Sequence, residues 1–264
     1  MNIGSESNSA KSNSGTPIID RGENAGNLIF EALNYLKGSL SADGGSCRPP
    51  NLARQKEDLH RWASGLGLLL SPSELPSKVF RGGQEHDLFH DEASDRYFKV
   101  TRNGIFGLSP GIDLQLVSSG KDGRCFHLWE ATPLEYFERL HLQNQLVPGL
   151  NAFEGIIVQP NDDIAIVTSQ PRFDIVKVTS SEIEEWFKRL GFEKIVESAY
   201  YRSSDNLGVF DAHEKNLVRG DQEVLIPFDV IPCHPKEGFR SFIEDTLTAG
   251  DTLRAVRTTH TAGR

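Results

Sequence analysis

The order of strand and helix signals after Val79 constrains the fold of this chain most strongly. From there on, short apolar runs are separated by turn signals, and two segments have the spacing of amphipathic helices. Read in order, the signals are β-β-β-α-β-β-α-β-β-β. Runs joined by tight turns pair as antiparallel hairpins, and the helices do not follow each strand in turn. The pattern therefore predicts an α+β fold.

The two helices have recognisable ends. The segment TPLEYFERLHLQNQL begins with Thr132, a predicted N-cap, and Pro133, which is favoured in a first helical turn. The segment SEIEEWFKRLGF is capped by Thr179 or Ser180, and Gly191 lies at its C-terminal end. Between them, FEGIIVQ and IAIVTSQ predict two strands joined by the turn PNDD.

The residues before this pattern are of a different kind. The first 23 are rich in Ser, Asn and Gly and have few apolar groups, which is typical of a disordered tail. Further on, Leu59, Trp62, Leu66 and Leu69 recur at helical spacing and predict a helix that packs on the following sheet. We therefore divide the chain into a tail (1–23), a short helix and linker (24–50), a main domain (51–235) and a C-terminal helix with a flexible tail (236–264).

Composition narrows the classes of function. The net charge of -9 disfavours binding to nucleic acid or to an anionic membrane, because both depend on clustered Lys and Arg. Three widely spaced cysteines, Cys47, Cys125 and Cys233, suggest neither a disulfide framework nor a CxxC zinc site. The N-terminus lacks the apolar core of a signal peptide, and LGLLL is too short to span a bilayer. We expect a cytoplasmic protein.

The stretch VFDAHEKNLV gathers polar side chains between two apolar runs. HEKNL begins like the zinc motif HExxH, but Leu217 stands where the second histidine is needed. What remains is Asp211, Asn216 five positions later, and Asp229 after a predicted hairpin. Phosphoryl transfer needs a carboxylate to accept a proton and oxygen ligands that hold magnesium. The kinase catalytic loop uses the same spacing, D-x-x-x-x-N, and the hairpin brings Asp229 beside Asn216.

Further parts of such a site occur upstream in a consistent order. Gly82 and Gly83 lie in a strand turn that could cover phosphates or could be an ordinary hairpin turn. Lys99 ends an alternating strand and is the natural partner of the phosphates. The segment IAIVTSQP, which includes Gln170, occupies the place of a hinge strand that holds adenine. These positions predict a nucleotide site.

Several of these segments together resemble a known family. GGQEHDLF, RYFKVT, TPLEYFERLHLQNQL, EGIIVQP, IVTSQP, GVFDAHEKNLV and PFDV look like the protein-kinase-like domain found in polyvalent proteins of phages and other mobile elements. The resemblance runs from about Leu59 to Pro232. More distantly, DAHEKN is similar to the DxHxxN loop of aminoglycoside and choline phosphotransferases, with His213 in the place of that loop's histidine.

The resemblance implies a protein-kinase-like fold, with an antiparallel N-lobe sheet, one main helix and a reduced C-terminal lobe. It implies ATP and Mg²⁺, with Asp211 as catalytic base, Asn216 and Asp229 as metal ligands and Lys99 on the phosphates. His213 belongs to the same catalytic loop, and we interpret it as holding the loop in shape. The chain departs from the family of ordinary kinases at Asp229, where DVI replaces DFG, and no activation segment ending in APE follows.

A helix glutamate should orient Lys99, and two are available. Glu138 borders the apolar face of its helix more closely than Glu135, so we prefer Glu138. The leading hypothesis is a phosphotransferase that acts on an unidentified hydroxyl acceptor, either a protein or a small molecule. One alternative is a pseudokinase that binds a nucleotide or a partner without transfer, and another is a metal-dependent hydrolase using Asp211, His213 and Asp229.

Overall fold

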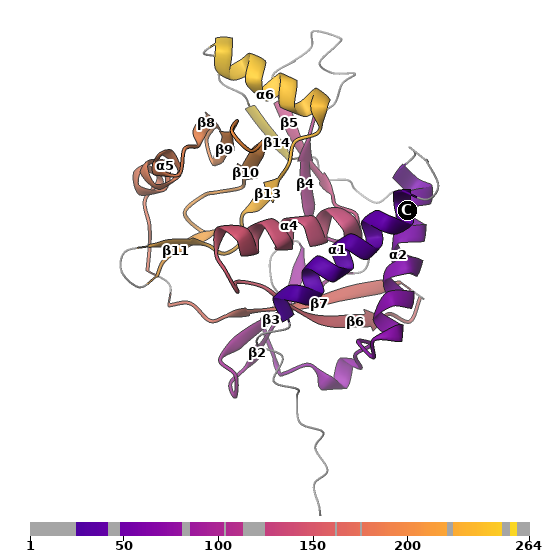
Figure 1. The fold of residues 1–264 in the computed structure, drawn as a ribbon. Helices are drawn as coiled ribbons and strands as arrows, with labels where there is room; N and C mark the ends of the chain where they lie inside the picture. The colour runs from indigo at the N-terminus through magenta and orange to yellow at the C-terminus, as the bar shows by residue number, and fades with distance from the viewer. Residues whose placement is uncertain are drawn as a thin grey trace, which may run out of the picture.

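A five-stranded antiparallel sheet carries Lys99 and forms the lower part of the molecule in Figure 1. In the computed structural model, residues 25–41, 48–80, 85–102, 104–112, 125–161, 163–174, 176–220, 224–249 and 254–257 are described. The strands of this sheet follow the order β1-β2-β3-β7-β6. Their bounds are Lys78–Phe80 (β1), His86–Asp91 (β2), Arg96–Thr101 (β3), Ile164–Pro171 (β7) and Ala152–Val158 (β6).

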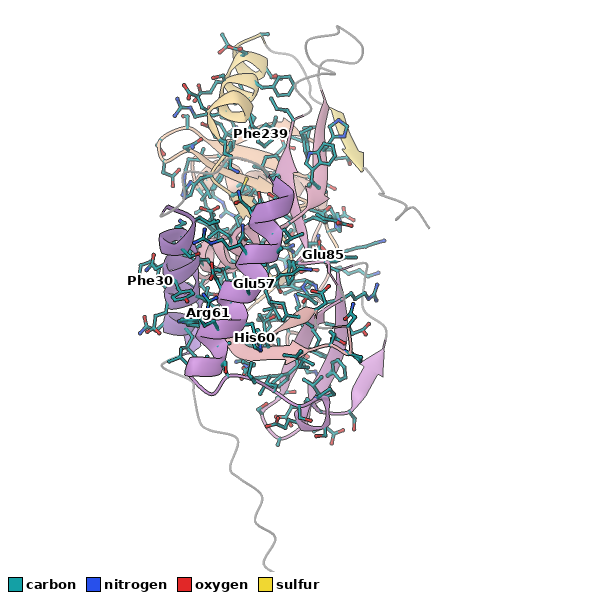
Figure 2. The ribbon with its side chains drawn as sticks, turned by 90° about the vertical axis from the view of Figure 1, so that its right-hand side faces the viewer. Phe30, Glu57, His60, Arg61, Glu85 and Phe239 are labelled. Atoms are coloured by element: carbon teal, nitrogen blue, oxygen red, sulfur yellow. The ribbon has the colours of Figure 1, made fainter. Side chains whose placement is uncertain are left out.

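Three helices cover one side of this sheet. They are α1 (Ala25–Ser41), α2 (Arg48–Gly65) and α4 (Pro133–Leu146), and α1 crosses α4 in Figure 1. Their apolar faces meet β6 and β7 in one core cluster. The outward face of α2 is polar, and Figure 2 shows Glu57, His60 and Arg61 along it. Burial of the apolar face of α4 therefore holds this helix against the sheet.

The N-terminal helices differ from the expected ones in their bounds. α1 continues to Ser41 and α2 begins at Arg48, so the predicted linker is helical at both ends, with residues 42–47 outside the described part of the chain. α2 ends at Gly65, and Gly67 has a left-handed φ of 67°. Such glycines end helices readily, so the helical spacing fails beyond this point. Leu66 and Leu69 are exposed, and Leu68 is buried in their place.

Two further sheets form the upper part of Figure 1, and a hairpin, labelled at β11, lies at the left near mid-height. The four-stranded sheet has the order β13-β10-β9-β8, and the three-stranded sheet has the order β14-β5-β4. The strands of the first are Glu193–Val196 (β8), Ala199–Arg202 (β9), Leu207–Phe210 (β10) and Ile231–Cys233 (β13). Those of the second are Leu108–Gly111 (β4), Cys125–Glu130 (β5) and Arg254–Arg257 (β14). The hairpin pairs Leu217–Arg219 (β11) with Leu225–Pro227 (β12).

Capping residues define the helices that follow these strands. Thr132 and Glu135 form a capping box at the start of α4, and Thr179 and Glu182 form one at the start of α5 (Ser180–Arg189). The predicted N-cap at Thr132 is confirmed, and Thr179 rather than Ser180 is the cap of α5. The remaining helices are α6 (Glu237–Ala249) and the 3₁₀ turn Pro72–Glu74.

The predicted α+β class is confirmed, with predominantly antiparallel sheets and five α-helices in the described residues. β5, the strand directly before α4, pairs with β4 and, in parallel, with β14, and is not part of the Lys99 sheet. β14 lies within the segment expected to be a flexible tail. Across the described ranges, we find no helix with the length and apolar character needed to cross a membrane.

Candidate active site

The loop between β10 and β11 brings Asp211 and Asn216 together. Asp211 directly follows β10 and has a left-handed backbone with φ of 56°. The Nδ2 group of Asn216 donates to the main-chain oxygen of Asp211 at 2.8 Å and to its Oδ2 at 3.0 Å. Aspartate is among the residues that adopt this backbone most readily. Two of the three residues predicted for phosphoryl transfer are therefore in direct contact.

His213 lies within the same loop and is tied to it. Its Nδ1 accepts a hydrogen bond from the amide of Lys215 at 3.2 Å, and its Nε2 lies 3.6 Å from Asp211 Oδ1. Its main-chain N–H donates to Asp211 at 3.0 Å, and its carbonyl accepts from Asn216 at 2.8 Å. These contacts shape the loop and leave the ring beside the carboxylate of Asp211.

Asp229 meets the loop on one side and Lys99 on the other. The β11–β12 hairpin pairs Leu217 with Pro227, and the amide of Asp229 donates to the carbonyl of Asn216 at 3.3 Å. Lys99, on β3 of the other sheet, donates from Nζ to Asp229 Oδ1 at 3.1 Å. The Lys99 side chain is 12% exposed and that of Asp229 is 38% exposed. Residues 130 positions apart thus form an ion pair at one site.

The structure does not bring the predicted helix glutamate to Lys99. Glu138 faces α1, where its Oε1 lies 3.6 Å from Nζ of Lys37. Glu135 uses Oε2 to accept the N–H of Thr132 at 2.9 Å as part of the capping box. Within the described part of the chain, Asp229 is the acidic partner of Lys99. The packing of α1 along α4 explains why Glu138 is turned away from the site.

The remaining predicted binding residues have different outcomes. Gly82 and Gly83 lie outside the described residues. Gln170, on β7, is buried, and its Nε2 donates to Asn151 Oδ1 at 2.6 Å and to the carbonyl of Phe228 at 2.9 Å. Its side chain therefore anchors the segment that carries Asp229, while the main chain of β7 remains the predicted hinge.

Arg139 is a site residue that the sequence analysis missed. It is 4% exposed on α4, and its Nη1 donates to Glu85 Oε2 at 2.7 Å. Its Nη2 lies 3.4 Å from Asp229 Oδ1. The signal was present in the sequence, because Arg139 shares a helical face with Tyr136 and Gln143 at spacings of three and four. A charged residue on an otherwise buried face needs a partner. In Figure 2, Glu85 is labelled to the right of α2, and its side chain is 17% exposed.

Four charges of alternating sign run through the site: Glu85, Arg139, Asp229 and Lys99. Burial favours the neutral form of Asp229, but Lys99 and Arg139 outweigh it, so the pKa of Asp229 lies below its usual value. Burial raises the pKa of Glu85 against the opposing effect of Arg139. Burial, followed by the charge of Lys99, lowers the pKa of His86 to about 3, so its ring is neutral at physiological pH.

The main chain around Asp229 is held by side chains from α4 and β7. All three carbonyls of residues 228–230 accept hydrogen bonds, and the first accepts the one from Gln170 already described. The carbonyl of Asp229 accepts from Arg139 Nη2 at 3.4 Å. The carbonyl of Val230 accepts from Arg139 Nε at 3.2 Å and from Gln143 Nε2 at 2.6 Å. Buried polar groups that are satisfied in this way fix the local backbone.

The donor atoms at the site fit magnesium. Magnesium prefers oxygen ligands and is usually bound by one or two carboxylates together with substrate phosphates. Asp229 supplies a carboxylate, and Asn216, which uses Nδ2 on Asp211, has an Oδ1 that accepts no hydrogen bond from the described residues. Those residues contain no cluster of three or more His, Cys, Asp or Glu side chains arranged to hold a metal. A magnesium ion here would thus need Asn216 and phosphate oxygens as further ligands.

A cavity of about 590 Å³ lies beside the loop and is partly lined by Ala212 and His213. Ser180 at the start of α5 and Ser198 between β8 and β9 contribute to its wall. The amide of Ala212 donates to the carbonyl of Ser198 at 2.9 Å, which joins the loop to that turn. The volume of the cavity is in the range of small-molecule sites.

Comparison with known families identifies a match to part of the chain. Residues 127–232 match the family model described as Serine/Threonine/Tyrosine Kinase found in polyvalent proteins. The match confirms the resemblance to the kinase-like domain of polyvalent proteins. It spans Asp211, Asn216 and Asp229, and it begins after Lys99 in the sequence. No curated protein and no solved structure matches the chain.

Proposed function

We propose, on the premise of this kinase-family match, that the protein is a phosphotransferase with a protein-kinase-like site that uses ATP and magnesium. The observation that carries the proposal is the convergence of Lys99, Asp211, Asn216 and Asp229. Lys99 comes from a different sheet and lies outside the matched segment, so its place beside Asp229 is support independent of the family match.

Each residue has a role that its contacts allow. Asp229 and Asn216 would hold the magnesium ion, which screens the charge of the phosphates and orients them. Lys99 would neutralise phosphate oxygens. Asp211 would accept the proton of the attacking hydroxyl while that oxygen bonds to the terminal phosphorus, and ADP leaves with the bridging oxygen. The contact from Asn216 holds the carboxylate of Asp211 in place.

The acceptor in this proposal is a small hydroxyl compound. The cavity that His213 partly lines supports a small acceptor, because the Nε2 atom of His213 lies 3.6 Å from the carboxylate of Asp211. A site of about 590 Å³ suits a small ligand better than a folded protein surface. A peptide hydroxyl presented on a chain remains the competing acceptor to be tested.

A thermal-unfolding screen of nucleotides with and without magnesium tests the proposal. A ligand at 100 times its dissociation constant stabilises the native state by about 2.7 kcal/mol, so ATP with magnesium should raise the melting temperature clearly. Phosphate transfer from labelled ATP to a panel of small hydroxyl compounds and peptides would then identify the acceptor. Absence of any nucleotide effect contradicts the proposal, and phosphoester hydrolysis without ATP would support the hydrolase alternative.

A pseudokinase is the second candidate, and one observation favours it. Asp229 is followed by Val230 and Ile231 where ordinary kinases have DFG. A protein of this kind would bind the nucleotide and use the complex to recognise a partner. Magnesium-dependent stabilisation by ATP without transfer to any acceptor or to the protein itself would identify it.

A further inference from the structure

We infer that Arg139, held by Glu85, positions Asp229 for magnesium, in the place where a helix glutamate was expected to act on Lys99. The inference rests on the proposed function, because it assigns a task within the same site. It names a positioning pair that neither the family match nor the spacing of the motif assigns.

The contacts of Arg139 reach both the side chain and the backbone of the metal-binding segment. Its Nε donates to the carbonyl of Val230 at 3.2 Å, and its Nη2 lies 3.4 Å from both the carbonyl and Oδ1 of Asp229. A guanidinium is planar and has five fixed donors, so one side chain can hold several acceptors at once. Arg139 therefore restricts where the carboxylate of Asp229 can lie.

Glu85 completes the device from the opposite side. Its Oε2 accepts from Arg139 Nη1 at 2.7 Å, which fixes the guanidinium and offsets its charge. Without that carboxylate, a buried arginine beside Asp229 would repel an incoming metal ion. Glu85 directly precedes β2, so the pair links the start of that strand to α4 and to Asp229.

Gly107 shows how closely the pair is enclosed. Its φ is 86°, and a Cβ atom there would lie 3.1 Å from Glu85 Oε2 and 3.2 Å from Arg139 Nη1. Contacts of this length are tighter than ordinary van der Waals contact, so the backbone at Gly107 forms a wall against the ion pair. The pair is built into the fold and is not a surface contact.

The test removes both charges together. In the double variant Glu85→Gln/Arg139→Met the local net charge is unchanged. Loss of the positive charge that lies 3.4 Å from Asp229 Oδ1 would by itself favour an incoming cation, so a weaker magnesium affinity reports positioning. We expect magnesium to bind about 10-fold more weakly at saturating non-hydrolysable ATP analogue, in line with the loss of a hydrogen bond to a charged group. In EDTA, hydrogen–deuterium exchange of peptides covering residues 225–231 should be faster than in the parent. Arg139→Lys should retain part of the magnesium affinity, because it keeps one donor and the charge.

Arg96→Met serves as the control. Arg96 is a partly buried arginine that donates to Ser169 at 2.9 Å and makes no contact with residues 228–230. The variant Arg96→Met should lower the melting temperature but should not change hydrogen–deuterium exchange in residues 225–231 or the affinity for magnesium. Unchanged exchange and magnesium affinity in the double variant would overturn the inference alone. Failure of the parent protein to bind nucleotide with magnesium would instead overturn the proposed function.

Discussion

At the scale of single residues, the proposed function gives the two aspartates of the site separable tasks. Asp211→Asn should leave binding of nucleotide and magnesium nearly intact but lower turnover by roughly 10²- to 10⁴-fold, the usual contribution of a general base. Asp229→Asn should weaken magnesium-dependent nucleotide binding, because it removes a charge from the metal. Titration with a non-hydrolysable nucleotide followed by turnover assays measures both. Equal loss of binding in the two variants would show that the roles are misassigned.

Lys99 and Glu138 offer a second test at this scale. Lys99→Ala should weaken nucleotide binding by about 10- to 100-fold, as loss of a charged hydrogen bond does. Glu138→Ala should not change nucleotide affinity, because Glu138 pairs with Lys37 on a partly exposed surface, and its effect on stability should stay below about 1 kcal/mol. A loss of nucleotide affinity in Glu138→Ala would restore the helix glutamate to the site.

His86 makes the stability of the protein depend on pH. Its Nε2 lies 2.9 Å from the hydroxyl of Tyr136, and its pKa falls from 6.5 to about 3 on folding. The unfolded chain therefore binds a proton that the folded protein excludes, so stability is full above pH 6.5 and is lost as the pH falls toward 3. Between pH 6.5 and 5 this group should cost about 2 kcal/mol.

Comparison of urea unfolding at these two pH values checks that expectation. The variant His86→Gln keeps a group that can bond to Tyr136 but does not titrate, so its stability should fall less between the two values. Equal losses in parent and variant would show that folding does not lower the pKa of His86.

At the scale of elements, Gly107 joins the sheet β4–β5 to the ion pair on α4. Gly107→Ala should destabilise the protein by at least about 1 kcal/mol, because alanine is strained at positive φ and its methyl group would press on Glu85 and Arg139. Gly38→Ala is the control, since Gly38 lies within α1 with open space around it and should stabilise by about 0.5–1 kcal/mol. Thermal unfolding of both variants gives the comparison. If Gly107→Ala leaves the stability unchanged, the residues around Gly107 can shift to accommodate a methyl group.

Local patterns predicted some elements well and others poorly. The start of α4 was readable from Thr132 and Pro133, because a cap and a first-turn proline act through neighbouring residues. The end of α2 was missed, although Gly65 and Gly67 were visible, because Leu66 and Leu69 continued the apolar spacing. β4 was also missed: its sequence LSPG has neither alternation nor β-branched residues, and it is a strand only because β5 lies beside it.

At the scale of the whole molecule, the candidate site was predictable where motif residues lie close in sequence or across one hairpin. Asp211, Asn216 and Asp229 are of this kind, and Lys99 followed from its position in the series. Arg139 and Glu85 lie 54 positions apart, and their pairing depends on how α4 packs against the strands. Spacing along a chain carries no information on such a contact, so the sequence led to Glu138, one residue away from Arg139.

The ion pair between Lys99 and Asp229 has a consequence for the order in which ligands bind. Lys99 is the counter-ion of the carboxylate that would hold magnesium under the proposed function, so magnesium alone would have to compete with an ammonium group 3.1 Å away. Phosphates that draw Lys99 away would release the carboxylate, and the two ligands should then favour each other by equal factors in both directions. Nucleotide and magnesium would bind cooperatively, and magnesium would bind weakly when no nucleotide is present.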